Sequence, residues 1–369
     1  MTRLGVWYDF RNPARWRLPW QQLYAETLDQ AAHAEQLGFT SIWLSEHHFT
    51  DEGYLPSLPA VLGALAERTS VARLGTAVLL APLHHPLRLA EDLAVVDQLS
   101  AGRLDVGLAP GYKPGEFAVL GVPKAERGAR TDETIEILQL AWRGEPFSYA
   151  GRHFRFDDVV VAPPPVQRPG PPIWVGGSSM AAARRAARHG VCFMPDSGAG
   201  RDVFDAYRAQ LPASAGPPRV ATNRVLFAAD SRDKAWEICG RHLLYQFNAY
   251  RRWFSDAGDD DAHGDELTDP AVLSPEHYFV GTPDDILSAI QQSQRRLGYQ
   301  ELVFWARPPG MPVEQSTASL ELIARHVLPA LADARPSVVP GHPMERPDRE
   351  RVAVDAKTDD DPAGDRRDP

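Results

Sequence analysis

Polar side chains that can transfer protons follow several short apolar runs of this chain. The clearest case is IWLSEHHF at residues 42–49, where Glu46, His47 and His48 come directly after apolar positions. Histidine has an unperturbed pKa close to neutral pH, so an imidazole placed here suits a general acid or base. Other apolar runs are followed by further polar side chains: Asp9, His84, His85, Tyr112, Ser178 and Ser179.

The three residues after the run at 42–45 cannot all face one pocket if the chain stays extended. Successive side chains of a strand point to opposite faces, so Glu46 and His48 share one direction and His47 takes the other. We therefore expect one histidine to act and the others to support it, and the candidate catalytic residues are His47, Glu46 and His85. The structural alternative is that each caps a helix or satisfies a buried backbone group.

Two adjacent histidine pairs, 47–48 and 84–85, also raise the question of a metal site, because imidazole is a common ligand for zinc and iron. Neighbouring strand residues diverge, which works against shared coordination. Metal-dependent barrel hydrolases usually carry His-x-His at the first strand, where this chain has Trp-Tyr-Asp. We predict no metal site.

A second candidate site is WVGGSSMAAARRAARHG at residues 174–190. Glycines let a phosphate approach the backbone, a serine caps a helix, and the free N–H groups at a helix start attract an anion. The pattern predicts a phosphate-bearing cofactor at Gly176, Gly177, Ser178 and Ser179. An ordinary capped helix would give the same pattern.

The apolar runs alternate with longer helical patterns, as βα units do. Eight strands are predicted, at 4–9, 41–45, 74–80, 104–108, 173–175, 191–194, 219–227 and 301–305. This order predicts a (β/α)8 TIM barrel with insertions, in which the polar residues after each strand gather at one end. The rival is a doubly wound open sheet, but no Gly-x-Gly-x-x-Gly follows an early strand.

The barrel domain is predicted to occupy residues 1–335. Residues 147–161 alternate like a hairpin and precede the proline-rich APPPVQRPGPP, so an insertion is expected at about 145–172. A mobile excursion is expected at about 251–276, where Asp and Gly are frequent, and a disordered charged tail at 336–369.

Composition limits the classes of partner. The formal net charge of -10 disfavours binding to nucleic acid or to an anionic membrane. The two cysteines lack metal-site spacing, and there is neither an apolar leader nor a run of eighteen apolar residues. We expect a cytoplasmic protein that acts on small molecules.

Four separated segments together resemble the luciferase-like flavin-dependent monooxygenases, the family of the bacterial luciferase alpha subunit. They are LGFTSIWLSEHHF (37–49), LGTAVLLAPLHHPLRLAEDLAVVDQLSAGRLDVGL (74–108), WVGGSSMAAARRAARHG (174–190) and VGTPDDILSAI (280–290). The resemblance implies an enzyme that binds reduced FMN (FMNH2), usually supplied by a separate flavin reductase. Oxygen then forms a flavin C4a-hydroperoxide, which oxygenates a small, partly apolar organic substrate.

The resemblance also implies roles for individual residues. His47 matches the family's acid or base beside the flavin, and a non-proline cis peptide under the flavin ring matches Ala77–Val78. Gly111 and Tyr112 are expected to contact the cofactor, and Ser178 and Ser179 its phosphate. The site must exclude water, so segments 11–20, 111–125 and 251–276 are candidates to cover it.

The chain departs from luciferase at Pro110, which matches a phosphate-binding arginine. Lys113, Arg184 or another cation could substitute, the flavin could bind weakly and transiently, or its phosphate could sit differently. Some relatives instead use a deazaflavin for hydride transfer, which gives an alternative function, and a non-catalytic flavin-binding subunit is a third. By resemblance, a homodimer is also expected. A role in secondary metabolism is a separate hypothesis about the substrate.

Overall fold

Parallel strands alternate with helices along residues 2–258 and 265–333, which the computed structural model describes and which belong to one compact unit, Met1–Ala334. The parallel strands are β1 (Arg3–Tyr8), β2 (Ser41–Leu44), β3 (Arg73–Thr76), β4 (Leu79–Leu80), β5 (Leu104–Ala109), β8 (Ile173–Gly176), β9 (Cys192–Met194), β10 (Ala221–Ala228), β11 (Tyr278–Gly281) and β12 (Glu301–Trp305). They pair in the order β11-β10-β12-β1-β2-β3-β5-β8-β9, with β4 beside β5.

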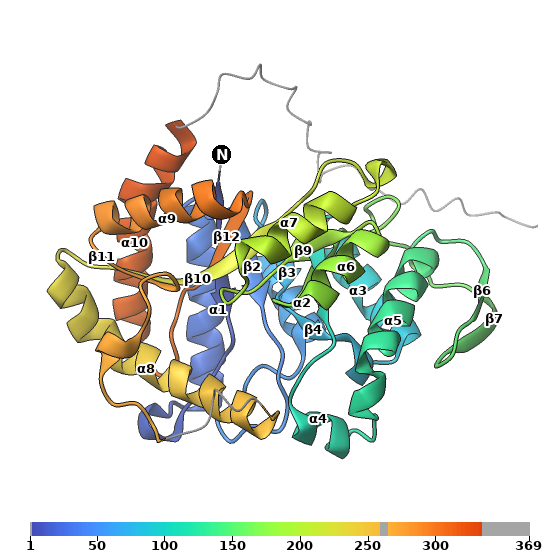
Figure 1. Ribbon diagram of the computed structural model, residues 1–369, viewed down its shortest axis with the longest axis horizontal. Coiled ribbons are helices and arrows are strands. Elements are labelled where there is room, and N and C mark those ends of the chain that lie inside the picture. Colours follow the sequence, from blue (N-terminus) through green and yellow to red (C-terminus); the bar gives the residue numbers. More distant parts are fainter. Residues whose placement is uncertain (1, 259–264, 334–369) are drawn as a thin grey trace, which may run out of the picture. The chain divides into compact units, whose positions relative to one another are not determined.

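The strands form a ring, because the sheet curls until the edges of β9 and β10 meet. A parallel bridge joins Phe193 in β9 to Val220, just before β10. β11 lies outside the ring, where it pairs with the second half of β10. All eight predicted strands belong to the ring, and the predicted TIM-barrel-like fold is confirmed (Figure 1).

The helices are α1 (Trp20–Gln36), α2 (Leu58–Arg68), α3 (Pro86–Leu99), α4 (Pro114–Val119), α5 (Arg127–Ala141), α6 (Met180–Arg188), α7 (Arg201–Gln210), α8 (Arg232–Asp256), α9 (Pro283–Leu297) and α10 (Val313–Asp333). Short 3-10 turns occupy η1 (Ala14–Trp16), η2 (Ala81–Leu83), η3 (Lys124–Glu126), η4 (Ala213–Ala215) and η6 (Pro270–Val272). In the part of the chain described, no helix is both long enough and apolar enough to cross a membrane.

Local sequence sets the ends of many helices. In α9, Thr282 and Asp285 form a reciprocal capping box, Pro283 takes the first turn, and Gly298 ends the helix with a left-handed φ of 70°. In α8, Ser231 caps the start by accepting a hydrogen bond from the N–H of Lys234. The helix then runs to Asp256, and its last turns pack on the end of the barrel.

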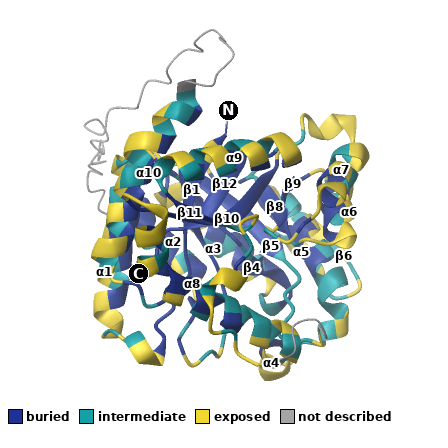
Figure 2. Ribbon diagram, turned by 60° about the vertical axis from the view of Figure 1, so that its left-hand side comes forward, coloured by how far each residue is buried: buried dark blue, intermediate teal, exposed yellow. Residues whose placement is uncertain are grey.

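The core has two layers, set by the alternation of side chains along each strand. Val6, Ile42 and Phe304 face outward and pack under the helices, whose outer faces are exposed (Figure 2). The inward residues include four tryptophans: Trp7 and Trp305 stack with ring centroids 3.9 Å apart, and Trp43 meets Trp174 edge-on at 5.9 Å. The barrel interior is therefore filled rather than hollow.

A buried carboxylate anchors the interior at the N-terminal ends of the strands. Glu301 accepts hydrogen bonds from the Ser41 hydroxyl at 2.5 Å and the Trp43 indole N–H at 3.2 Å, and it pairs with Arg3 at 3.0 Å. Since a buried charge is costly unless it is paired, these contacts fix the positions of β1, β2 and β12 relative to one another.

The expected insertion contains an antiparallel hairpin of β6 (Phe147–Ala150) and β7 (Arg155–Val159), which stands beside α5 (Figure 1). Its turn is held by Glu133, whose carboxylate accepts the backbone N–H groups of Arg152, His153 and Phe154. The expected excursion at about 251–276 contains the end of α8 and η6. Its residues 259–264, like the expected tail at 336–369, lie outside the described residues.

The tight packing inside the barrel gives a stability prediction. A Cβ at Gly75 in β3 would overlap the Trp43 ring, so Gly75→Ala should destabilise the fold by about 1–3 kcal/mol. At Gly115 in α4 a Cβ would meet no atom within 4 Å, so Gly115→Ala should change stability by no more than about 0.5 kcal/mol. Thermal unfolding of the two variants tests this; equal midpoints would show that the interior is loosely packed.

Candidate active site

His47 lies just past the end of β2, where it is buried and only 6 % exposed. Its Nδ1–H donates to the Glu116 carboxylate at 2.8 Å, and the same Glu116 oxygen accepts the backbone N–H of His48 at 2.8 Å. A carboxylate that accepts from Nδ1 leaves Nε2 as the imidazole atom able to take up a proton. Glu116 therefore selects the tautomer of His47.

Burial lowers the pKa of His47, and although the hydrogen bond to Glu116 opposes this, the net direction is downward. The imidazole is thus neutral at physiological pH. The rings of Tyr54, Tyr112 and Trp253 surround it, with centroids 4.8, 5.6 and 5.2 Å away. The geometry is that of a general base held among aromatic side chains.

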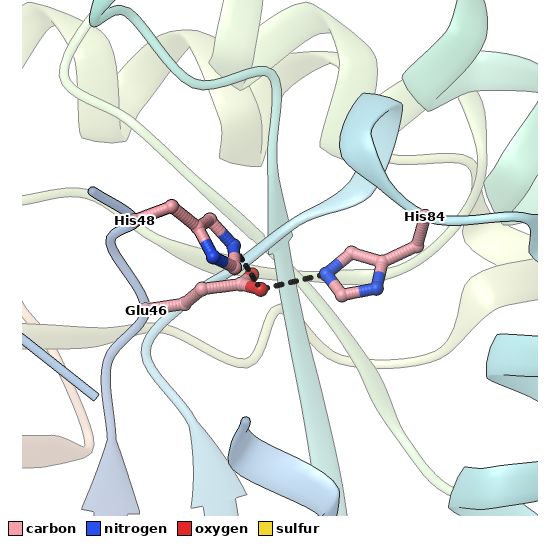
Figure 3. A group of neighbouring side chains, drawn as sticks. All are labelled: Glu46, His48 and His84. Atoms are coloured by element: carbon pink, nitrogen blue, oxygen red, sulfur yellow. Dashed lines mark hydrogen bonds and ion pairs between the residues drawn. The ribbon is translucent and has the colours of Figure 1, made fainter. Parts of the chain in front are cut away.

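Glu46 turns the other way, as strand alternation requires, and forms the centre of a separate cluster (Figure 3). One carboxylate oxygen accepts Nε2–H of His48 at 2.8 Å and of His84 at 2.7 Å, and the other accepts the backbone N–H of Leu80 at 2.6 Å. Burial alone would raise the pKa of Glu46, but the two histidines lower it to about 2. In return Glu46 raises the pKa of His84 above its usual value, against the effect of burial.

The cluster of Glu46, His48 and His84 offers one carboxylate and two imidazole atoms within 4.8 Å of one another, a donor set that a divalent metal ion could use. Both Nε2 atoms already point at Glu46, and hydrogen bonding accounts for their arrangement (Figure 3). The absence of a metal site stays a prediction.

His85 does not join either group, and its selection as a catalytic candidate stays a prediction. It is the exposed residue before α3, and its ring lies 6.0 Å from Phe154 and 5.8 Å from Phe156 in the hairpin. The backbone is extended at His84 and at His85, so the two side chains point in opposite directions. His84 is the residue that turns inward.

The residue before β4 and the ends of β5 and β8 form a shelf of small side chains. The Ala77–Val78 peptide is cis, as expected, and the Ala77 N–H donates to the Leu44 carbonyl at 2.6 Å. A Cβ at Gly176 would lie 2.8 Å from Val78 and 3.6 Å from Ala109, so these three residues are neighbours. We call Val78, Ala109 and Gly176 the shelf.

The predicted phosphate site lies at the start of α6, directly after the shelf. Gly177 has a φ of 122°, which favours glycine, and Ser178 is exposed. Ser179 caps α6 by accepting the N–H of Ala182 at 3.2 Å. An ordinary cap and an anion site both fit this geometry.

The residues after β5 divide between two environments. Gly111 has a φ of 73°, and the ring of Tyr112 stacks on Phe254 at 4.7 Å. The Tyr112 hydroxyl is buried and, among the described residues, has no hydrogen-bond partner. Lys113 lies 3.9 Å from Glu116 and 4.2 Å from the Trp253 ring centroid, so it faces the His47 side, whereas Arg184 on α6 is exposed.

α8 crosses the end of the barrel, on the same side of the molecule as α4 (Figure 1). Tyr250 lies 6.4 Å from Trp305 at the end of β12, Trp253 contacts His47, and Phe254 contacts Tyr112. The last turns of α8 therefore lie over His47 and Tyr112. A cavity of about 300 Å³ opens between β1, α1 and residues 307–314, and its lining includes Asp9 and Arg11 but not His47.

The partners of His47 come from segments that are remote in sequence. Glu116, Tyr54 and Trp253 were not candidate site residues, although Glu116 and Trp253 fall in two segments expected to cover the site, 111–125 and 251–276. One signal was available for Glu116: it is an acidic residue in the first turn of a proline-initiated helix after a strand end. Nothing local marks Tyr54 or Trp253.

A family model described as luciferase-like monooxygenase matches residues 2–301. The chain is 26% identical over 334 residues to the flavin-dependent trigonelline monooxygenase, oxygenase component, of Acinetobacter baylyi, covering 85% of this chain and 92% of that protein. It is 30% identical over 270 residues to the FMNH(2)-dependent dimethylsulfone monooxygenase of Pseudomonas putida, covering 70% of each.

A solved structure is also similar. The monooxygenase RslO1 from Streptomyces bottropensis superposes with a TM-score of 0.79 at 30% sequence identity, covering 89% of this chain and 100% of that one. The fold is thus shared over most of the chain.

The hydrogen bond between His47 and Glu116 gives a titration prediction. Glu116 favours the charged imidazole, so Glu116→Gln should lower the pKa of His47 further. The measurement is an NMR titration of ¹⁵N-labelled imidazoles, with His47→Asn used for assignment. Glu136→Gln, which changes a carboxylate bonded to Tyr149, is the matched control and should leave His47 unchanged. A His47 titration unaffected by Glu116→Gln would contradict the assigned role.

Proposed function

The chain belongs to the luciferase-like monooxygenase family and is an oxidoreductase, and from this premise we propose that it is an oxygenase component that uses reduced FMN and O2 to oxygenate a small, partly apolar organic substrate. The observation that carries the proposal is a neutral, buried His47 with Nδ1 bonded to Glu116.

The names of the relatives support a flavin-dependent monooxygenase reaction and reduced FMN as its cofactor. One is named as a flavin-dependent oxygenase component, and another as FMNH(2)-dependent. An oxygenase component receives its reduced flavin from elsewhere, so we include a separate flavin reductase among the proposed partners. A homodimer and a cytoplasmic location stay predictions from the sequence.

The residues at the barrel end suit two parts of an FMN molecule, its ring system and its phosphate. The small side chains of the shelf would leave room for an aromatic ring system, and the buried Tyr112 hydroxyl lacks a partner among the described residues. The start of α6, with Gly177 and Ser178, suits a phosphate. Pro110 supplies neither charge nor N–H, so the serines and helix end would hold the phosphate without an adjacent arginine.

The chain's own residues have defined tasks in this proposal. Reduced flavin, when bound, supplies the electrons for oxygen activation. His47 takes up or delivers a proton at Nε2, and Glu116 keeps Nδ1 protonated. Tyr54, Tyr112 and Trp253 exclude water from this imidazole.

Deazaflavin-dependent hydride transfer is the competing function, because the shelf and the α6 phosphate site would serve either cofactor. The two differ in their reaction with oxygen. A non-catalytic flavin-binding subunit would have no need of the His47–Glu116 pair, which argues against that third possibility.

Anaerobic titration distinguishes these functions. The protein should bind reduced FMN more tightly than a reduced deazaflavin, and admitting O2 should start oxygen consumption coupled to product formation when candidate substrates are present. His47→Ala should reduce product formation roughly 100-fold while changing the dissociation constant for reduced FMN less than about threefold. Tight deazaflavin binding without oxygen consumption would overturn the proposal.

The phosphate site can be tested by charge. Ser178→Asp places a carboxylate at the start of α6, where it favours the helix but repels a phosphate, so FMN affinity should fall roughly tenfold or more. Riboflavin, which lacks the phosphate, should bind the variant and the wild type alike. Ser214→Asp, an exposed serine in η4, adds the same charge elsewhere and serves as the control. Equal losses for FMN and riboflavin would place the phosphate away from α6.

A further inference from the structure

Arg11 follows Asp9 by two residues at the end of the barrel. It is a buried cation, and only one of its three guanidinium nitrogens donates a hydrogen bond to a described residue. Its side chain is 0% exposed, and Nη2 donates to Glu52 at 2.6 Å. Nε and Nη1 are buried and have no hydrogen-bond partner among the described residues. Buried donors are nearly always paired in folded proteins, so unpaired ones at the end of a barrel indicate the position of a ligand acceptor.

Four aromatic rings enclose this guanidinium. The Arg11 Cζ atom lies 5.8 Å from the ring centroid of Tyr54, 5.6 Å from those of Tyr245 and Tyr250, and 5.1 Å from that of Trp253. We call Arg11 and these four aromatic residues the Arg11 box. Its walls are flat and mainly apolar, which suits a flat aromatic ligand.

The Arg11 box adjoins the catalytic imidazole. Tyr54 and Trp253, which form two of its walls, also contact His47, at centroid distances of 4.8 and 5.2 Å. Tyr54 and Trp253 thus contact both the Arg11 guanidinium and the His47 ring. A ligand that reached Arg11 would lie beside the acid or base.

The charges around the Arg11 box favour a neutral acceptor over an anion. Glu52 is paired with Arg11 and also accepts the Tyr245 hydroxyl at 2.8 Å. Asp9 accepts the backbone N–H of Arg11 at 3.2 Å and the Trp305 indole N–H at 3.1 Å. Burial raises the pKa of Asp9 to about 6, against the opposing effect of Arg11, so it is mainly ionised at neutral pH. Two carboxylates already offset the guanidinium charge.

We propose that the Arg11 box binds the substrate, and that the class of substrate is a flat aromatic compound whose neutral carbonyl oxygen accepts hydrogen bonds from Arg11. This inference rests on the proposed function for the identity of the reaction, but it is a statement about binding. Arg11 is a specificity-determining residue in it, because a ligand without the oxygen leaves Nε and Nη1 unpaired.

The test compares three matched naphthalenes: 2-acetonaphthone carries the neutral carbonyl, 2-ethylnaphthalene lacks the oxygen, and 2-naphthoate carries an anion. Equilibrium dialysis against the full chain, with and without oxidised FMN and with no reductant, measures affinity without turnover. The ketone should bind at least tenfold more tightly than the ethyl compound and more tightly than the naphthoate. A ketone-to-ethyl ratio near one, or tightest binding of the naphthoate, would overturn the inference.

Variants assign the effect to Arg11. Arg11→Lys keeps the charge but loses the planar set of donors, so the ketone-to-ethyl ratio should fall below about threefold. Arg15→Lys, the same change at an exposed arginine stacked on Trp16, should behave as the wild type. An unchanged ratio in a folded Arg11→Lys protein would also overturn the inference.

Glu52→Gln provides an independent readout that does not depend on Arg11→Lys folding. Removing one carboxylate beside the guanidinium should tighten naphthoate binding at least threefold and leave the ethyl compound unchanged. No gain for the naphthoate would place the ligand away from Arg11. Because dialysis involves neither reduced flavin nor oxygen, a failure of the proposed monooxygenase activity would appear separately, in the anaerobic titration.

Discussion

The carboxylate of Glu46 is the constraint on which the site depends. It bonds the backbone of Leu80 and the imidazoles of His48 and His84, and so ties the end of β2 to the segment that contains the cis peptide. With Glu46 and His48 fixed on one side of an extended chain, His47 must face the other side, where Glu116 receives it. One buried charge thereby sets the direction of the imidazole and the position of the shelf.

The environment of His47 combines two opposite electrostatic effects. Burial among aromatic rings favours the neutral imidazole, and the Glu116 carboxylate favours the charged one. The first effect is larger, so the resting ring is a proton acceptor, yet a charged state formed during a reaction would find a partner already in place. The same aromatic side chains extend to Arg11, which joins His47 and the Arg11 box into one aromatic-walled region.

Sequence reasoning reached the barrel because each strand is a short apolar run, and it separated His47 from Glu46 because alternation along a strand is local. It chose His85 over His84, since only the turn at η2 decides which of two neighbours points inward. The cis bond at Ala77–Val78 followed from the family resemblance rather than from local pattern. The contacts of Glu116, Arg11 and Trp253 depend on how remote segments pack, although all three lie in segments expected to cover the site.

The tryptophans that fill the barrel interior have a consequence for inhibitor design. Trp7, Trp43, Trp174 and Trp305 close the floor beneath the strand ends, so there is no depth into which an elongated blocker could extend. Compounds aimed at this end of the barrel would instead have to spread sideways under α8, whose rings pack over it. Chemical breadth, rather than length, is the property to vary in such compounds.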